Sequence, residues 1–181
     1  MSVAALLLAA GQSRRFGTAD KLLADLDGRA LVTHAAGALE GVADRVAVVS
    51  SRAVADLLQP MGFRLVMQPP GQPQSASLSA GISAIDGSGA TRVVIALGDM
   101  PFIGTGDIAG LIALRDDAPG CCWKDGAPIP PAIFPASYFG RLMALTGDRG
   151  AGALLRNVPP TMRIEIPAAR LRDIDRPTDL P

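Results

Sequence analysis

The chain has 181 residues, a length typical of one domain, so we expect a single domain over residues 1–181. Hydrophobic residues make up 49% of the chain and aromatic residues only 4%, which favours a core of Ala, Leu, Val and Ile in packed α/β layers. Because 17 basic and 17 acidic residues cancel, the chain lacks the overall positive charge of most nucleic-acid-binding proteins, and no nucleic-acid partner is expected.

Short apolar runs mark three predicted strands in the first part of the chain, at residues 3–9, 46–49 and 93–97. Continuous runs of this kind are typical of strands that are covered on both faces, as in a parallel sheet. Helical patterns separated by Gly, Pro or Asp lie between and after them, at residues 30–39, 54–58, 77–85 and 108–114. The alternation predicts βαβ units, and therefore an α/β fold with a mostly parallel central sheet and helices on both faces.

The second half of the chain gives a less regular pattern. Prolines at 128, 130 and 131 precede the apolar residues 132–134, which we expect at the start or edge of a sheet strand. Further helices are predicted over 137–145 and 152–158. Earlier in the chain, Asp27-Gly28 predicts the tight turn of a small hairpin that carries residues 22–26.

The adjacent residues Cys121 and Cys122 bear on the cellular compartment. Neighbouring cysteines rarely bridge each other, and two ligands do not make a zinc site, so we expect buried thiols in a reducing environment. The apolar N-terminal run has no basic region before it and is too short to span a bilayer, which predicts neither a signal peptide nor a membrane partner. A cytoplasmic location is the expectation.

A Gly-rich loop between the first strand and Lys21 is the first functional signal. Gly11 and Gly17 flank Ser13, Arg14 and Arg15, and the backbone N–H groups of such a turn can bind an anion. The dinucleotide motif needs Gly at position 13, and the P-loop needs Gly-Lys at positions 16 and 17, so the spacing excludes both and disfavours a Rossmann dehydrogenase. The alternative is an ordinary strand-to-loop turn with solvated arginines.

Lys21 ends this loop in a chain where fifteen of the seventeen basic residues are Arg. A compact ammonium suits the β- and γ-phosphates of a nucleoside triphosphate as a point charge. We therefore interpret Lys21 as a triphosphate-binding residue.

Two acidic positions are candidate Mg²⁺ ligands. Asp99 follows the predicted strand at 93–97, and ligands of open α/β sheets bind at the carboxyl ends of the strands. Asp173 and Asp175 are spaced to share one face, and one of them could approach the end of the first strand. Because Mg²⁺ usually takes one or two protein carboxylates, Asp99 and Asp175 would suffice. A turn residue or helix cap at either position is the alternative.

The remaining candidates are weaker. Ser77 lies near a predicted helix start, where it is either the N-cap or a contact to the base or ribose of a nucleotide. His34, Trp123 and Tyr138 are interpreted as packing or surface residues.

Five motifs in order along the chain resemble the MobA-like NTP transferases, specifically their molybdenum cofactor cytidylyltransferase branch. The first reads Leu8-Ala9-Ala10-Gly11-Gln12-Ser13-Arg14-Arg15-Phe16-Gly17 and is followed by Lys21. The others are Ser77-Leu78 with Gly81, Gly98-Asp99-Met100-Pro101, Gly147-Asp148-Arg149-Gly150, and Asp173-Ile174-Asp175-Arg176-Pro177 with Asp179-Leu180.

The resemblance implies a Rossmann-like nucleotidyltransferase fold and assigns roles to these residues. Arg15, Lys21 and Asp99 would be catalytic, and Asp99 and Asp175 would hold Mg²⁺. The nucleotide would be bound by Leu8, Ala9, Ala10, Gly11, Ser13, Arg14, Arg15, Lys21 and Ser77.

The reaction that the resemblance implies is transfer of CMP from CTP to the terminal phosphate of molybdopterin or molybdenum cofactor, with release of pyrophosphate. The partners would be CTP or another NTP, a phosphorylated pterin-type acceptor and a molybdoenzyme that receives the product. Ala9-Ala10 and Asp175 are similar to the cytidylyl branch, whereas guanylyl relatives favour Gly-Gly and Asn there.

Two departures from the family pattern concern the acceptor: Gly152 stands where Arg is expected, and Pro130-Pro131 interrupt the usual segment. Two alternatives stay open. One is guanylyl or other nucleotidyl transfer to a sugar phosphate or similar acceptor, and the other is a non-catalytic nucleotide-binding accessory protein for molybdoenzyme maturation.

Overall fold

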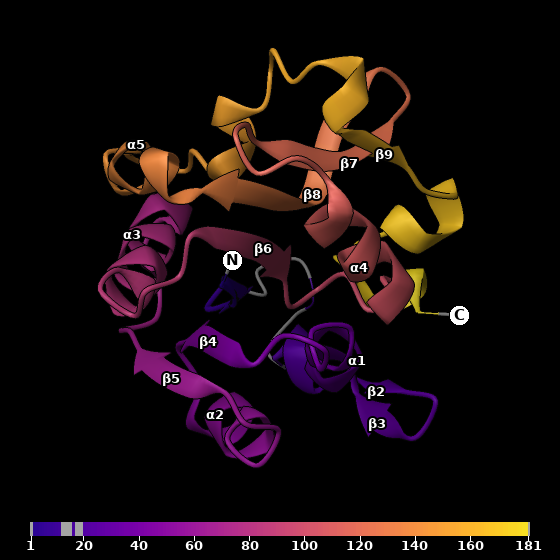
Figure 1. The fold of residues 1–181 in the computed structure, drawn as a ribbon. Coiled ribbons are helices and arrows are strands. Elements are labelled where there is room, and N and C mark those ends of the chain that lie inside the picture. The colour runs from indigo at the N-terminus through magenta and orange to yellow at the C-terminus, as the bar shows by residue number, and fades with distance from the viewer. Residues whose placement is uncertain (1, 12–15, 17–19, 181) are drawn as a thin grey trace.

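The computed structural model describes residues 2–11, 16 and 20–180. In this part of the chain, seven strands form one central sheet in the order β5-β4-β1-β6-β8-β7-β9, and helices cover both of its faces (Figure 1). These strands are β1 (Val3–Ala9), β4 (Asp44–Val49), β5 (Arg64–Met67), β6 (Arg92–Leu97), β7 (Gly120–Lys124), β8 (Ala127–Pro135) and β9 (Arg163–Glu165). A separate hairpin pairs β2 (Asp25–Leu26) with β3 (Arg29–Ala30).

The described helices are α1 (Leu31–Gly37), α2 (Arg52–Leu58), α3 (Gln74–Ile85), α4 (Thr105–Ala113) and α5 (Phe139–Met143). Short 3₁₀ turns span Lys21–Leu23, Ala136–Tyr138, Ala151–Leu154, Pro160–Met162, Ala168–Leu171 and Pro177–Asp179. Within the sheet, β5, β4, β1 and β6 are parallel, β8 is antiparallel to both β6 and β7, and β9 is parallel to β7. The predicted Rossmann-like α/β fold with a mostly parallel sheet is confirmed.

Alternation along the parallel strands divides the core into two layers. Leu6 of β1 is level with Val46 and Ile95 on the neighbouring strands, and all three pack with α3 and α5 on one face. The next residue, Leu7, is level with Ala47 and Ala96 and packs with α1, α2 and α4 on the other face. Both leucines are fully buried, which explains why the runs read as continuously apolar.

Gly81 of α3 shows how closely a helix approaches this sheet. A Cβ atom at this position would lie inside contact distance of the Leu6 side chain and 3.0 Å from Cγ2 of Val48. Only glycine therefore lets α3 lie this near to β1 and β4, which accounts for the glycine after Ser77-Leu78 in the sequence.

The proline-rich segment before residue 132 is not a strand start, contrary to the expectation. It lies inside β8, a central strand between β6 and β7, but only residues 132–135 pair with β6. Pro130 and Pro131 lie opposite a register shift of β7 between Cys121 and Cys122. An irregularity of this kind leaves strand residues without ladder partners, so prolines are accommodated there without loss of a hydrogen bond.

The predicted helix over 152–158 is also wrong, because the structure has only the 3₁₀ turn Ala151–Leu154 there. Pro159 and Pro160 follow directly, and a proline disfavours helical geometry in the residue before it. The helix predicted over 137–145 is observed as a 3₁₀ turn followed by α5. The strands β5, β7 and β9 were not predicted, since each is short and mixes charged or polar residues with apolar ones.

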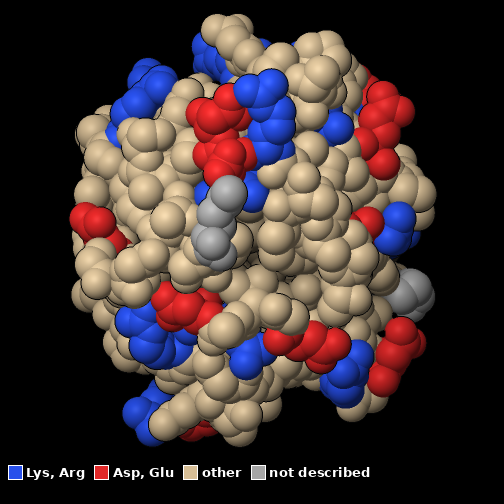
Figure 2. Space-filling view, viewed as in Figure 1, with Lys and Arg blue, Asp and Glu red and all other residues tan. Residues whose placement is uncertain are grey.

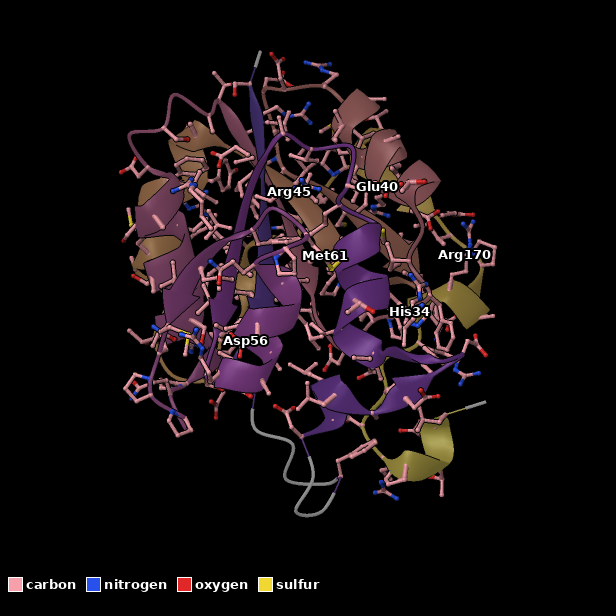
Figure 3. All side chains as sticks on the ribbon, turned by 90° about the horizontal axis from the view of Figure 1, so that it is seen from below. His34, Glu40, Arg45, Asp56, Met61 and Arg170 are labelled. Carbon is pink, nitrogen blue, oxygen red and sulfur yellow. The ribbon has the colours of Figure 1, made fainter. Side chains whose placement is uncertain are left out.

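The small hairpin predicted at Asp27-Gly28 is present, with both turn residues at positive φ. It is shorter than expected, because residues 21–23 form a 3₁₀ turn instead. His34 on α1, labelled in Figure 3, fastens the hairpin: Nε2 donates to the carbonyl of Leu26 at 2.8 Å, and Nδ1 accepts from Arg29 at 3.0 Å. His34 therefore has a structural role, as predicted, and fills it through hydrogen bonds to the hairpin.

Charges of both signs are interspersed on the face that Figure 2 shows, without a large field of one sign, as the zero net charge suggests. Among the described helices, none is long and apolar enough to cross a membrane.

Candidate functional site

The carboxyl ends of β1 and β6 lie together at one edge of the sheet. Leu8 of β1 is level with Leu97 of β6, and the N–H of Gly98 donates to the carbonyl of Leu8 at 2.9 Å. A Cβ atom at position 98 would lie 3.2 Å from Cβ of Ala9, so glycine keeps the two chains close. This register brings Asp99 next to the segment that leaves β1.

Lys21 joins this edge to the C-terminal segment. The 3₁₀ turn that begins at Lys21 is capped by Asp20, whose carboxylate accepts from the N–H of Leu22 at 3.0 Å. Nζ of Lys21 lies 2.7 Å from Oδ2 of Asp99 and 3.0 Å from Oδ1 of Asp175. The exposed fractions of the three side chains are 10%, 24% and 37%, so the ammonium is the least accessible of the three groups.

Opposing effects act on the pKa of Lys21. Burial, the largest of them, lowers it, but the charges of Asp99 and Asp175 and their hydrogen bonds together raise it above its ordinary value. The ammonium form is therefore held by its two partners, and Lys21 is cationic at neutral pH. The ammonium therefore has a fixed position at the ends of β1 and β6.

A main-chain contact brings Asp175 to this position. The N–H of Ile174 donates to the carbonyl of Asp99 at 2.9 Å, and the Ile174 side chain is fully buried. The carboxylate of Asp179 then accepts from the N–H groups of Asp175 and Arg176 at 2.9 and 2.7 Å. On this segment Ile174 is buried, its neighbour Asp175 contacts Lys21, and Asp173 is exposed.

A cavity of about 410 Å³ lies beside this cluster. Of the residues predicted to bind a nucleotide or metal, those lining it are Leu8, Ala9, Ala10, Gly11, Lys21, Ser77 and Asp99. Ser13, Arg14 and Arg15 lie outside the described residues, and Asp175 contacts Lys21 but does not line the cavity.

Several lining residues were not predicted from the sequence. They are Leu22, Gly71, Gln72, Pro73, Gln74, Leu97 and Asp148. The segment from Gly71 to Gln74 leads from β5 into α3, and a signal for it exists: Pro69-Pro70-Gly71 marks a loop between two apolar segments. Recognising β5 would have placed this loop at the same sheet edge as Asp99, since β5 is parallel to β4 and β1.

Ser77 does not cap α3, because the helix begins at Gln74 after Pro73 and has no side-chain cap. Its hydroxyl instead donates to Oε1 of Gln68 at 2.9 Å. Nε2 of Gln68 donates in turn to the carbonyl of Ala76 at 3.2 Å, which fixes the orientation of the amide. With its proton committed to Gln68, the buried Ser77 hydroxyl offers lone pairs to the cavity and acts there as an acceptor.

The chemistry of Asp99 and Asp175 suits a divalent cation. Their carboxylate oxygens converge on one atom, Nζ of Lys21, so both can reach a single point in space. Hard cations such as Mg²⁺ prefer oxygen ligands and need only one or two carboxylates when substrate phosphates and water complete the shell. The described residues contain no cluster of three or more His, Cys, Asp or Glu side chains that could hold a metal by themselves.

Comparison with known proteins finds a match to the MobA-like NTP transferase domain over residues 5–163. Among curated proteins, the bifunctional enzyme IspD/IspF of Rhodobacter capsulatus is 28% identical over 121 residues, which are 66% of this chain. The matched region is 32% of that enzyme, so this chain corresponds to only part of it.

Solved structures share the whole fold. Rv0371c from Mycobacterium tuberculosis matches with a TM-score of 0.82 and 22% identity over 99% of this chain and 96% of that one. A nucleotidyl transferase from Methanothermobacter also has a TM-score of 0.82 and 22% identity, over 98% and 94% of the two chains. A structure of Rv0371c in complex with manganese has a TM-score of 0.72 and 20% identity over 92% and 89%.

Proposed function

The chain belongs to the MobA-like NTP transferase family, and on that premise we propose that it transfers CMP from CTP to the terminal phosphate of molybdopterin or molybdenum cofactor, releasing pyrophosphate. One observation carries the proposal: Lys21 is held between Asp99 and Asp175 beside a cavity at the ends of β1 and β6. The motif resemblance at Ala9-Ala10 and Asp175 supports the cytidylyl branch.

In the proposed reaction, an oxygen of the acceptor phosphate attacks the α-phosphorus of the triphosphate. A new O–P bond forms, the bond from the α-phosphorus to the bridging oxygen of the β-phosphate breaks, and its electron pair leaves with pyrophosphate. The acceptor phosphate is already ionised at neutral pH, so no strong general base is needed. The protein's task is then to position the two substrates and neutralise charge.

Lys21 and the two aspartates divide this task. A cation about 4 Å from a phosphate charge contributes roughly 4 kcal/mol at an effective dielectric near 20, more than a neutral hydrogen bond. Asp99 and Asp175 would hold Mg²⁺, which when bound would neutralise the triphosphate and the charge that develops on the leaving pyrophosphate. The manganese complex of Rv0371c supports a divalent cation in this fold. Arg15 is proposed as a second triphosphate-binding residue.

The Ser77 hydroxyl bears on the choice between CTP and UTP. Because this hydroxyl donates to Gln68, it can accept from an amino group of a base but cannot donate to a carbonyl without losing its partner. Cytosine carries an exocyclic amino group where uracil carries a carbonyl. The Ser77–Gln68 pair therefore favours CTP over UTP.

Thermal unfolding with saturating CTP, GTP, ATP, UTP or NAD, each with and without Mg²⁺, tests the proposal. A ligand at about 100 times its Kd adds about 2.7 kcal/mol, or several degrees in Tm for a chain of this size. We expect a Mg²⁺-dependent shift that is largest with CTP, followed by pyrophosphate release when molybdopterin is added. A larger GTP shift would move the assignment to guanylyl transfer, and binding of CTP without turnover of any phosphorylated acceptor would favour the accessory protein.

A further inference from the structure

A second cavity, of about 380 Å³, adjoins the first. Leu8, Gln74 and Leu97 line both, so the two spaces meet where β1 and β6 end. A ligand in the second cavity would thus lie directly beside one bound near Lys21 and Asp99.

The segment Gly147-Asp148-Arg149-Gly150 lies where the two cavities meet. Asp148 lines the first cavity and Arg149 the second. The segment is fixed on the start of α3, because the carbonyl of Gly147 accepts from the N–H of Ser75 at 3.3 Å. A Cβ atom at position 150 would lie 2.7 Å from Oε1 of Gln74, so Gly150 packs closely against the end of that side chain. The Gly147–Gly150 segment therefore lies between the two cavities and contributes a side chain to each.

Charge distinguishes the second cavity. Its wall includes apolar side chains from β1, β6, β8 and residues 151–155, and the charged side chains lining it are Arg149 and Arg156. None of the described lining residues is acidic. Both arginines are exposed, and neither makes an ion pair or hydrogen bond with a described residue.

Three arginines on other surfaces of the described chain contrast with this pair. Arg52, Arg64 and Arg170 are each bound to an aspartate at 2.8 or 2.9 Å. Two guanidinium groups without a counter-charge at one cavity are suited to a phosphate, whose oxygens can accept several charge-assisted hydrogen bonds at once.

We propose that this second cavity is the acceptor subsite, that Arg149 and Arg156 bind the acceptor's phosphate, and that the apolar wall packs against a face of the framework that carries this phosphate. The inference rests on the proposed function, since it assigns a place to the second substrate of that reaction. The acceptor class is a phosphomonoester whose framework can present one face to the apolar wall.

The assignment also accounts for Gly152, where the resemblance leads one to expect Arg. Gly152 lines the same cavity, and a Cβ atom there would have no neighbour within 4 Å. Arg156 lies four residues further on and supplies a positive charge to the same space.

Phenyl phosphate is the probe for this subsite, because it combines a flat apolar ring with a phosphate. Its binding to the full chain is measured by calorimetry in the presence of saturating CTP and Mg²⁺, with phenol and inorganic phosphate as comparison ligands. We expect phenyl phosphate to bind more tightly than either, and the double variant Arg149→Gln/Arg156→Gln to weaken it at least about tenfold with CTP binding unchanged. The double variant Arg52→Gln/Arg115→Gln removes the same charge elsewhere and should bind the probe as the wild type does.

Failure of this inference differs from failure of the proposed function. Equal binding of phenyl phosphate to the wild type and the Arg149→Gln/Arg156→Gln protein, or displacement of CTP by the probe, would overturn the subsite and leave the nucleotidyl transfer intact. If CTP did not bind while the probe still depended on the arginines, the proposed reaction would fall, and with it the acceptor role.

A gain-of-binding variant completes the test. Because position 152 has room for a side chain, Gly152→Arg should fold normally and restore probe binding to the Arg149→Gln/Arg156→Gln protein by several fold. Gly152→Gln is the uncharged control and should not restore probe binding. Equal rescue by both substitutions would show that charge at this cavity is irrelevant and would contradict the proposal.

Discussion

The charged side chains at the two cavities have opposite environments. At the ends of β1 and β6, Lys21 is nearly buried and held by Asp99 and Asp175, so its charge is positioned before any ligand arrives. At the second cavity, Arg149 and Arg156 are exposed and have no acidic neighbour among the lining residues. This is the difference expected if the first cavity is a preorganised site for the proposed nucleotide and the second a more adaptable site for the proposed acceptor. The following predictions test that difference.

The largest effect is expected from Asp99→Asn. The substitution removes one of two proposed metal ligands and a partner of Lys21, and we expect turnover to fall by at least about 10²-fold to 10³-fold, the range for loss of a group that stabilises the transition state. Release of pyrophosphate from CTP provides the measurement. Asp173→Asn, at an exposed position of the same C-terminal segment as Asp175, is the matched control. Wild-type turnover in the Asp99→Asn protein would rule out the metal assignment.

Removal of the ammonium separates its two roles. In Lys21→Met, the carboxylates of Asp99 and Asp175 lose the cation between them, and we expect a loss of about 2 kcal/mol in unfolding free energy, or several degrees in Tm. A divalent cation bound by the same carboxylates would compensate for the lost charge. Mg²⁺ or Mn²⁺ should therefore raise the Tm of this variant more than that of the wild type, even though CTP binding is weakened.

The corresponding control for Lys21→Met is Lys124→Met, which removes a lysine that lies outside both cavities. Its Tm should respond to metal as the wild type does. A metal response in Lys21→Met no larger than this would mean that Asp99 and Asp175 do not form a cation site together.

An intermediate effect is expected at Gln68. Gln68→Leu frees the Ser77 hydroxyl to rotate, so it can donate to a carbonyl as well as accept from an amino group. We expect the preference for CTP over UTP to fall by about tenfold, since one hydrogen bond to an uncharged group contributes about 1 to 1.5 kcal/mol. Kd values for both nucleotides give the ratio, and Gln59→Leu at the end of α2 is the control. An unchanged ratio would remove Ser77 from base selection.

The smallest effect on function concerns the thiols of β7, which lie in the other half of the sheet. Burial is the largest cause that raises the pKa of Cys121 to about 11 and that of Cys122 to about 12. Because the unfolded thiols ionise near pH 9, the folded state binds more protons above that value, so stability is retained below pH 9 and falls as the pH rises towards 11. Alkylation at pH 8 should be slow in the native protein and fast in denaturant. Rapid native alkylation would show that this half of the sheet opens easily.

The sequence predicted three of the four parallel strands, β1, β4 and β6, but missed β5, and it predicted the other half of the sheet poorly. Residues 3–9, 46–49 and 93–97 are apolar throughout because helices cover both faces of these strands, and that pattern is visible without a structure. By contrast, β7 and β9 combine charged and apolar residues, and β8 contains prolines that only the register shift of β7 makes acceptable. Whether short segments of this kind form strands depends on the strands that pair with them in the folded sheet.

The sequence by itself determined the fold class, the family and the residue types of the first site, because buried strands, glycine turns and the residues that follow strand ends are local patterns. Only the tertiary structure decided which residues meet. The main-chain hydrogen bond between Ile174 and Asp99 brings Asp175 to Lys21. Ser77 bonds to Gln68 and does not cap a helix, and Arg149 and Arg156 line one cavity. These contacts join segments that are far apart in the chain or connected by loops. Their geometry depends on tertiary packing, which no local sequence pattern encodes.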